Sequence, residues 1–532
     1  MRSKIHGAIA AGHSKTVEAG MEMFRLGGNA FDAAVAAVMA AFVAEPTLTS
    51  PAGGGFLLAH TQTGDNILFD FFTQTPQHKR ELATVDFYPV EVNFGSVTQE
   101  FHIGLGSIAV PGTIGGLLHV HRRLGQLPLS VVVEPAIHCA KTGVEISAFQ
   151  SYCFKILAPI LLNTPESQRL FAPQGRLPQP GDRFTLPDLA ETLHYFAKEG
   201  VRGFYEGDIG QQLAKDCQEQ GGYITRSDLQ HYQVIERQPL ATTYRSRTFL
   251  TNPPPSSGGA LIGFALALLE AIDLSHLSFG SSEHLSLLAR VMQLTNLARR
   301  DGFDANLYEA EVAATFLAPD HLAQYRQQLL QQWDWPISSL NKWGSTTHLS
   351  VIDSEGNAAS VTTSNGEGSS YVIPGTGIMT NNMLGEADLH PQGFHGWQPD
   401  VRISSMMAPT MILRQGKPEI VLGSGGSNRI RTAILQVISN LLDFGMNVEQ
   451  AVSSPRVHWE DGIFNLEPGL PTDSQANQQL SLNRSRFPFN GQLELWQQQN
   501  MFFGGVHAVT RNLSGEFSGA GDHRRDGAIY AG

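Results

Sequence analysis

Alternating apolar and polar residues predict a β-hairpin in the C-terminal half of the chain. Leu349 and Val351 alternate with polar neighbours within residues 344–353, which is the pattern of a half-buried strand. The Ser-Glu-Gly-Asn run at 354–357 has the composition of a turn, and residues 358–363 then read as a returning strand. Because β-propensity alone would explain the hydroxyl residues of these strands, the hairpin indicates no function by itself.

Helical patterns dominate the N-terminal part of the chain. Residues 14–45 are predicted to be helical, with a break at 27–28 and with Asn29 as the N-cap of a second helix. That helix is rich in alanine, which indicates close packing against a sheet. Further elements are expected as a strand at 68–72, helices at 117–124, 208–218 and 260–272, and a strand at 505–509.

The composition is that of a globular protein and excludes several kinds of partner. Of the 532 residues, 42% are hydrophobic and 16% are charged, so the chain is long and apolar enough for several domains or one large α/β enzyme. The net charge of −13 argues against a nucleic-acid or anionic-membrane partner. No window offers the roughly 18 uncharged apolar residues of a membrane span, and the N-terminus lacks the apolar run of a secretory signal.

The chain contains three cysteines, Cys139, Cys153 and Cys217. Their spacing matches no metal site or Cys-x-x-Cys motif, and an odd, low count is typical of a reducing compartment, so we expect a cytoplasmic protein. Neither a metal nor a cofactor is expected, since no His-Glu-x-x-His motif occurs and the glycine run at 53–55 lacks the Gly-Lys-Ser/Thr ending of a phosphate loop. His348 is expected to pack within its strand, whereas His390 and His395 are expected at the surface.

Five blocks rich in glycine and hydroxyl residues follow one another from the hairpin toward the C-terminus. They lie at 344–353, 363–368, 374–383, 404–410 and 423–430. In this order and at this spacing they resemble the γ-glutamyltranspeptidase family, most of all a bacterial branch described as glutathione hydrolases. The resemblance covers nearly the whole chain and includes segments at 110–116, 251–259 and 519–527.

Members of that family are made as an inactive precursor that cleaves its own chain just before a threonine. Carried onto this chain, the resemblance places the cut between Ser345 and Thr346, giving a large fragment of residues 1–345 and a small fragment of residues 346–532 that stay associated. It implies one structural domain of the α/β class, a four-layer αββα sandwich of the N-terminal-nucleophile hydrolase type. The polar segment 320–345 suits such cleavage, because the carbonyl of Ser345 must be reachable.

Cleavage before Thr346 would place a hydroxyl and a free α-amine on one residue. A hydroxyl needs a nearby base to act as a nucleophile, and an α-amine with a pKa of about 7.7–8.0 can be that base near neutral pH. The reaction implied is transfer of an acyl group from an amide, through an acyl-enzyme on Thr346, to water or an amine. The resemblance has Thr347 orient the nucleophile or assist self-cleavage, and has Ser364 lie near the new amine. It places the oxyanion-hole amides at Gly425 and Gly426, or one residue along, because the usual proline before the pair is absent.

Substrate recognition is where the chain departs from the family pattern. Ser404 and Ser405 are retained from the group that binds the α-carboxylate of a γ-glutamyl donor, and Glu386 takes the place of the acid that binds its α-amine. The family's carboxylate-binding arginine is replaced by Phe72, and such a loss costs about 1.5–3 kcal/mol of charge-assisted hydrogen bonding. Met383 likewise replaces an amide or acid of the family pattern.

Two arginines elsewhere, Arg402 and Arg429, could supply the missing charge, and the sequence leaves this open. We therefore expect a self-processing transferase or hydrolase that acts on a small amide or peptide such as glutathione or another γ-glutamyl compound. An acylase of the cephalosporin or glutaryl type is the alternative within the class, and an unprocessed, non-catalytic binding protein is the alternative outside it. A serine hydrolase of the α/β-hydrolase type lacks its Gly-x-Ser-x-Gly motif here.

Overall fold

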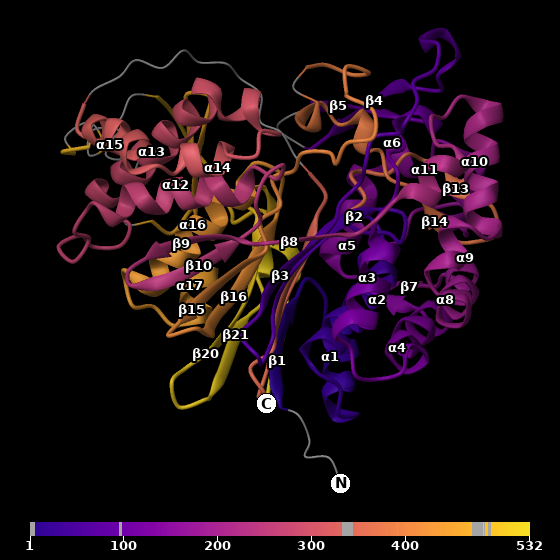
Figure 1. Ribbon diagram of the computed structural model, residues 1–532, viewed down its shortest axis with the longest axis horizontal. Helices are drawn as coiled ribbons and strands as arrows, with labels where there is room; N and C mark the ends of the chain where they lie inside the picture. The colour runs from indigo at the N-terminus through magenta and orange to yellow at the C-terminus, as the bar shows by residue number, and fades with distance from the viewer. Residues whose placement is uncertain are drawn as a thin grey trace.

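A computed structural model of the protein describes residues 6–94, 98–331, 344–390, 392–470, 482, 485–487 and 491–532. Residues 332–343 of the expected polar segment 320–345 lie outside these ranges. Within them the chain builds two large antiparallel sheets that pack face to face, with helices on both outer faces (Figure 1).

The first sheet brings together strands from the beginning, middle and end of the chain. Its strands are β1 (Gly7–Ala11), β2 (Gly54–His60), β3 (Asn66–Phe71), β8 (Ile235–Arg237), β11 (Thr347–Asp353), β12 (Ala358–Ser364) and β22 (Ala528–Ala531). Within the described residues they lie in the order β22–β1–β11–β12–β2–β3–β8, antiparallel throughout. The predicted hairpin is confirmed as β11 and β12, and it lies inside this sheet with neighbours on both sides.

The second sheet is made mostly from the C-terminal part of the chain. Its strands are β9 (Leu240–Tyr244), β10 (Arg247–Thr251), β15 (Thr410–Arg414), β16 (Lys417–Gly425), β20 (Gly505–Arg511) and β21 (Phe517–Ala520). In the part of the chain that the structure describes, their order is β21–β20–β16–β15–β10–β9. β11 and β12 of the first sheet pack against β16 and β20, so the two inner faces form a shared core.

Helices cover the outer face of each sheet (Figure 1). Against the first sheet lie α1 (Ser14–Arg25), α2 (Ala30–Ala44) and α3 (Thr113–Leu124), backed by α4 (Leu129–Thr142) and α8 (Pro187–Glu199). Against the second lie α12 (Gly258–Glu270), α16 (Arg429–Leu442) and α17 (Val448–Ser453), with α13 (Ser282–Ala298) beside α12. These layers confirm the expected αββα sandwich of the α/β class.

Smaller elements complete the molecule around this sandwich. The remaining helices are α5 (Ala148–Ile156), α6 (Ala158–Leu161), α7 (Pro165–Phe171), α9 (Val201–Tyr205), α10 (Asp208–Gln220), α11 (Arg226–His231), α14 (Val312–Phe316) and α15 (Pro319–Gln328). The remaining strands are β4 (Tyr88–Asn93), β5 (Thr98–Ile103), β6 (Val144–Glu145), β7 (Arg183–Phe184), β13 (Val372–Ile373), β14 (Ile378–Met379), β17 (Val457–Glu460), β18 (Ile463–Leu466) and β19 (Gln492–Leu495).

The α2 helix shows how local sequence fixes one layer of the fold. The Asn29 side chain accepts hydrogen bonds from the N–H groups of Phe31 and Asp32, and the Asp32 carboxylate accepts one of 3.0 Å from the N–H of Asn29. This reciprocal capping box confirms the predicted N-cap. Every residue of α2 is buried, because its alanines let it pack closely between the first sheet and the helices α1 and α4.

The β11 strand is more buried than its sequence pattern predicts. All its residues are buried, whereas alternation of apolar and polar residues had predicted a half-buried strand. One face lies against α2 and the other against the second sheet, so its polar side chains must find partners inside the protein. His348, as expected, packs within the strand: its Nδ1 lies 2.8 Å from Thr362 Oγ1 and its Nε2 lies 2.9 Å from Ser350 Oγ.

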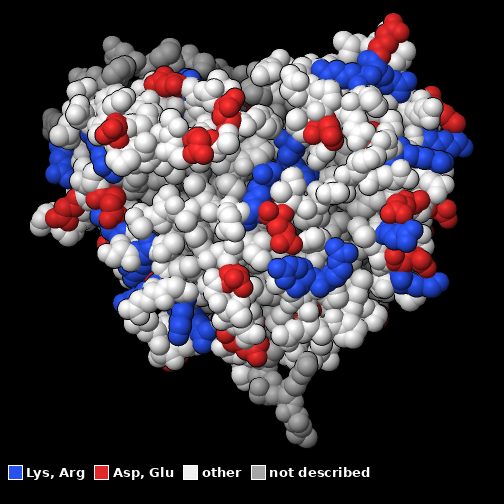
Figure 2. Space-filling view, viewed as in Figure 1, with Lys and Arg blue, Asp and Glu red and all other residues white. Residues whose placement is uncertain are grey.

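The surface carries charges of both signs. In Figure 2, acidic and basic side chains are interspersed over the visible face, among many uncharged residues. Among the helices of the described ranges, none combines the length and apolar character needed to cross a bilayer. Nor do the described His, Cys, Asp and Glu side chains form a group of three or more that could hold a metal ion.

Candidate active site

Thr346 immediately precedes β11. In the first sheet, β11 lies between β1 and β12. The Ser345–Thr346 peptide bond is intact in this structure, so the geometry is that of the uncleaved chain. Thr346 is 6% exposed, and its hydroxyl makes no hydrogen bond within the described residues. Its carbonyl oxygen accepts a hydrogen bond of 3.1 Å from Arg525 Nη1. The backbone of Thr346 is thus fixed while its hydroxyl remains unengaged.

The peptide before Thr346 is held from both sides. Ser364 Oγ donates a hydrogen bond of 2.5 Å to the carbonyl oxygen of Ser345, and accepts one of 2.9 Å from the N–H of Gly366. The Glu367 carboxylate accepts hydrogen bonds from the N–H of Ser345 at 3.0 Å and from its hydroxyl at 2.5 Å. Burial raises the pKa of Glu367, although these two bonds from Ser345 oppose the shift. The carbonyl of Ser345 therefore has a fixed position and a polarising donor.

The side chain of Thr347 contacts the carboxyl group of Glu45. Its Oγ1 donates a hydrogen bond of 2.7 Å to Glu45 Oε1, and Thr16 Oγ1 donates one of 3.1 Å to Glu45 Oε2. Glu45 is fully buried, and burial raises its pKa to about 7 despite both hydroxyl contacts. The residue after the candidate nucleophile is thus anchored to a carboxyl at the end of α2.

Gly425 and Gly426 lie against the backbone of Thr346 at the end of β16. A Cβ atom placed on Gly425 would lie 2.1 Å from the carbonyl oxygen of Thr346, and Gly426 adopts a φ of +125°, which favours glycine. Close approach and backbone shape thus both require glycine here. Neither residue is among those that line the pocket described below.

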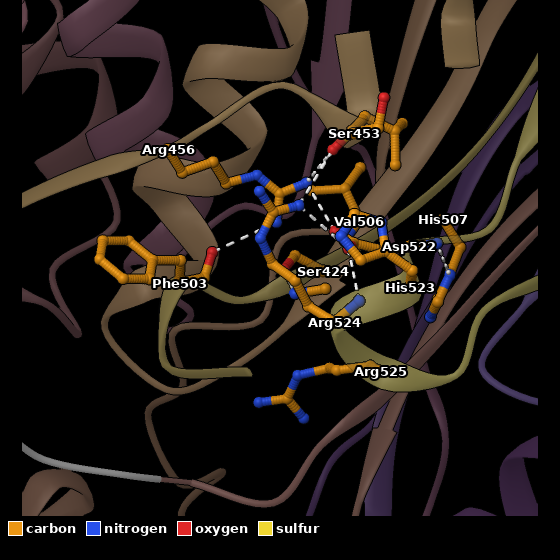
Figure 3. Close-up of polar contacts among 12 residues, drawn as sticks. Ser424, Ser453, Arg456, Phe503, Val506, His507, Asp522, His523, Arg524 and Arg525 are labelled. Carbon is orange, nitrogen blue, oxygen red and sulfur yellow. Dashed lines mark hydrogen bonds and ion pairs between the residues drawn. The ribbon is translucent and has the colours of Figure 1, made fainter. Parts of the chain in front are cut away.

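A buried ion network around Asp522 lies beside Arg525, whose N–H donates a hydrogen bond of 3.0 Å to the carbonyl oxygen of Asp522. Figure 3 shows Asp522 between the guanidinium groups of Arg456 and Arg524, with Arg525 set apart from them. Asp522 lies 2.6 Å from Arg456 Nη2 and 3.2 Å from Arg524 Nη1, and Arg524 also pairs with the buried Glu467. Burial alone would raise the pKa of Asp522, but the two guanidinium groups bring it well below its usual range.

A pocket of about 90 Å³ opens beside Thr346 and collects most of the expected site residues. Its lining includes Phe72, Ser345, Thr346, Ser364, Glu386, Ser404 and Ser405. It also includes Met383, which replaces an amide or acid of the family pattern, and several further apolar side chains. A larger pocket of about 770 Å³ lies elsewhere, between the 164–188 and 369–377 segments, and contains none of the expected site residues.

The two arginines considered as substitutes for position 72 are engaged elsewhere. Arg402 donates to the carbonyl oxygens of Phe72 and Gln233 at 2.6 and 2.7 Å, and its Nε lies 3.3 Å from the Asp70 carboxylate. Arg429 Nε donates to the carbonyl oxygen of Phe502 at 3.1 Å. Neither arginine lines the pocket, so neither supplies a charge there.

Phe72 and Glu386 line the pocket with a buried aromatic ring and a carboxyl group. Phe72 is 1% exposed and stacks on Phe56, with ring centroids 5.3 Å apart. Glu386 is half-buried, its Oε1 has no hydrogen-bond partner within the described ranges, and burial together with the nearby Glu367 raises its pKa well above the usual value. A side chain at Gly366 would lie 2.2 Å from Glu386 Oε1, so glycine there makes room for the carboxyl.

Sequence reasoning missed four residues that the structure places in or beside the site. They are Glu45, Arg299, Glu367 and Arg525. Glu367 and Arg525 lie within blocks that carry the family resemblance, but their contacts depend on pairing between distant segments. Glu45 gave one local signal, since it is a lone acid that ends an apolar helix.

The αββα sandwich is the architecture of the N-terminal-nucleophile hydrolases. Comparison with known proteins identifies the family within this class. The γ-glutamyltranspeptidase family model matches residues 16–532, so the chain belongs to this family of hydrolases and acyl-transferring enzymes. The family predicted from the sequence blocks is thereby confirmed.

Individual relatives carry two kinds of name. The Acylase ACY 1 proenzyme of Pseudomonas sp. (strain SE83) is 32% identical over 99% of this chain and 93% of the relative. The glutathione hydrolase proenzyme of Escherichia coli (strain K12) is 30% identical, covering 88% of this chain and 84% of the relative. The crystal structure of cephalosporin acylase from Bacillus halodurans shares the fold with a TM-score of 0.85 at 24% identity, covering 100% of this chain and 97% of that one.

Proposed function

We propose that the protein cleaves its own chain between Ser345 and Thr346 and then uses Thr346 as the N-terminal nucleophile of an acyl-transfer reaction. The observation that carries this proposal is the setting of the Ser345–Thr346 peptide. Its carbonyl accepts a hydrogen bond from Ser364, and the hydroxyl that would attack it has no other partner within the described residues. Relatives in the family are named proenzymes, which supports a maturation step.

Self-cleavage would proceed by attack of Thr346 Oγ on the carbonyl carbon of Ser345. The peptide C–N bond breaks as the nitrogen takes a proton, which leaves an ester between Ser345 and the threonine oxygen and a free α-amine. Water then hydrolyses the ester, giving a carboxylate on Ser345 and restoring the hydroxyl. Ser364 is placed to stabilise the negative charge that develops on the carbonyl oxygen in the first step.

The two fragments would remain associated after the cut. β11 and β12, from the small fragment, lie between β1 and β2 of the large fragment in the first sheet. Separating the fragments would break both ladders and expose the core between the two sheets. We therefore infer a stable two-fragment enzyme with one structural domain, residues 1–345 and 346–532.

In the mature enzyme, Thr346 would attack the carbonyl of an amide donor with its own α-amine as base. The tetrahedral intermediate collapses to an ester on Thr346 as the amine product leaves with a proton, and water or an acceptor amine then takes the acyl group. We infer that Gly425 and Gly426 supply backbone donors for the oxyanion, since their N–H groups lie in the segment that packs on Thr346.

The donor is a small amide or peptide, and a γ-glutamyl compound such as glutathione is the first candidate. Glu386, Ser404 and Ser405 support this reading, because they line one pocket with Thr346. A second candidate is a non-glutamyl amide of the kind an acylase would hydrolyse. The buried Phe72 and the pocket's methionines favour it, since they offer apolar contacts where a second polar group would be needed.

Mass spectrometry of the purified protein, followed by an anilide assay, tests the proposal. We expect fragments ending at Ser345 and beginning at Thr346, and release of aniline from γ-glutamyl or other acyl anilides by the processed protein only. Thr346→Ala should remain one chain and release none, whereas Thr315→Ala, an exposed threonine on α14, should behave as wild type. An intact wild-type chain without anilide turnover would favour the non-catalytic binding protein instead.

A further inference from the structure

We propose that Arg299 binds a carboxylate on the acyl group of the donor, so that the enzyme prefers acyl chains ending in an acidic group. The inference rests on the proposed function, because it concerns the pocket beside Thr346. Among the described residues that line this pocket, Arg299 is the one basic side chain. A charged side chain placed in a ligand pocket fixes the orientation of the ligand.

Arg299 is held in place by the fold around it. It follows the last residue of α13, and the chain then turns sharply through Gly302, whose φ is +128°. Tyr308 Oη donates a hydrogen bond of 3.0 Å to the carbonyl oxygen of Arg402. This bond ties the turn that carries Arg299 to the segment that carries the pocket serines Ser404 and Ser405.

The guanidinium of Arg299 is oriented at one edge and open at the other. Its Nε donates to both carboxylate oxygens of Asp304, at 3.0 and 2.8 Å. Its two Nη groups have no hydrogen-bond partner within the ranges that the structure describes, and the side chain is 23% exposed. Because a guanidinium presents several donors in a rigid fork, Asp304 can fix its plane while the Nη groups bind a second carboxylate.

Acidic groups in the same pocket oppose an anion, but each is compensated. Asp304 is paired with Arg299 itself, and Asp388 accepts a hydrogen bond of 3.1 Å from Ser427 Oγ and interacts electrostatically with the buried guanidinium of Arg429. Glu386 lies in surroundings that favour its neutral form. An anion in the pocket therefore meets one oriented cation and carboxyl groups that are already paired or close to neutral.

The N-terminus of α16 adds to the attraction. Asn428, the N-cap, and Ile430 both line the pocket, so the positive end of this helix, which spans Arg429–Leu442, faces the same space as Arg299. The unpaired N–H groups and the dipole of the first helical turn favour a negative charge there. A carboxylate between this helix end and Arg299 would be stabilised from two sides.

A pair of donors that differ only in charge tests the assignment. Glutaryl and pentanoyl p-nitroanilides have the same chain length and end in a carboxylate and a methyl group. For Arg299→Gln we expect kcat/KM on the glutaryl donor to fall by about tenfold or more, mainly through KM, while the pentanoyl donor changes by less than about twofold. Arg299→Lys should recover part of the loss. Arg300→Gln, which removes a pair with Asp461 outside the pocket lining, should leave both donors unaffected.

Equal losses on both donors would show that Arg299 only supports the fold, and an unchanged glutaryl rate would show that it touches no carboxylate. Calorimetric binding of glutarate to the unprocessed Thr346→Ala protein provides a reading that needs no turnover. Loss of glutarate binding on adding Arg299→Gln supports the assignment even if the proposed catalysis fails. Binding of pentylammonium in preference to glutarate overturns it, because the acidic groups would then dominate the pocket.

Discussion

Ser364 Oγ lies 2.5 Å from the carbonyl oxygen of Ser345 and donates a hydrogen bond to it. The same hydroxyl accepts a hydrogen bond of 2.9 Å from the N–H of Gly366, which directs its proton toward that carbonyl. This contact exists in the uncleaved chain, before any free amine is formed. That Ser364 also lies near the amine that cleavage would release stays a prediction.

Replacing Ser364 with alanine should slow self-cleavage by about 100-fold, because removing one donor to a developing oxyanion costs on the order of 10²–10³ in rate. A time course of fragment formation on a denaturing gel measures the effect. Ser364→Thr keeps the hydroxyl and should cleave, and Ser354→Ala, in the exposed turn after β11, should match wild type. Maturation of Ser364→Ala at the wild-type rate would remove the residue from the mechanism.

Glu45 should make stability depend on pH in a predictable direction. Its pKa rises from 4.5 in the unfolded chain to about 7 in the fold, so between these values the folded state holds a proton that the unfolded state releases. Stability contributed by this group is therefore full below about pH 4.5 and falls as pH rises through 7, by a total on the order of 3 kcal/mol.

Urea unfolding of the Thr346→Ala protein at about pH 5 and pH 8, with and without Glu45→Gln, measures the pH-dependent contribution of Glu45 to the free energy of unfolding. We expect the glutamine variant to lose less stability than its parent between the two pH values. Glu18→Gln, at an exposed position on α1, is the matched control and should leave the pH dependence unchanged. Parallel curves for parent and Glu45→Gln would show that Glu45 titrates as an ordinary carboxyl.

Gly425 should tolerate no side chain. Because an added Cβ would lie 2.1 Å from the carbonyl oxygen of Thr346, Gly425→Ala must displace the nucleophile or the end of β16. We expect a loss of about 1–3 kcal/mol of stability and of most self-cleavage. Gly263→Ala is the control, since its nearest neighbour would lie at an ordinary 3.7 Å and the residue is inside a helix. Full maturation of Gly425→Ala would contradict the close contact.

Local features of the fold could be predicted from the sequence because their causes are local. The Asn29 cap and the β11–β12 hairpin depend on neighbours within a few residues, and both are found as expected. Burial of β11 on both faces could not be predicted, because it depends on a second sheet made of strands far along the chain. His390 fails for the same reason: expected at the surface, it is buried and its Nε2 lies 2.9 Å from the carbonyl oxygen of Met383.

The candidate site also combines residues that could be predicted from the sequence with contacts that could not. The serine pair and Glu386 were expected near Thr346, and the structure brings them to one pocket, although their catalytic roles remain proposals. Arg525 reaches the Thr346 carbonyl across 179 positions of sequence, and no periodicity or motif spacing reports such a contact. The choice between Arg402 and Arg299 as a pocket cation likewise depends on which side chain other partners already occupy.

Asp522 should be the most costly residue to neutralise in the region behind Thr346. It is fully buried between Arg456 and Arg524, and removing one partner of a buried ion pair costs about 3–5 kcal/mol because the remaining charge is left uncompensated. Since its pKa is lowered in the fold, this contribution is present above the unfolded value of about 3.8 and is lost as pH falls below it.

Asp522→Asn should therefore unfold at lower urea than its parent at neutral pH, with the difference shrinking in acid. The variant should also cleave slowly, because Asp522 accepts from the N–H of Arg524 and so positions the turn that carries Arg525 onto the carbonyl of Thr346. Asp526→Asn is the matched control: it lies in the same turn at a left-handed φ of +57° that asparagine tolerates, and it should stay near wild type. If Asp522→Asn matures normally and loses less than about 1 kcal/mol, the buried network does not hold Arg525 in place.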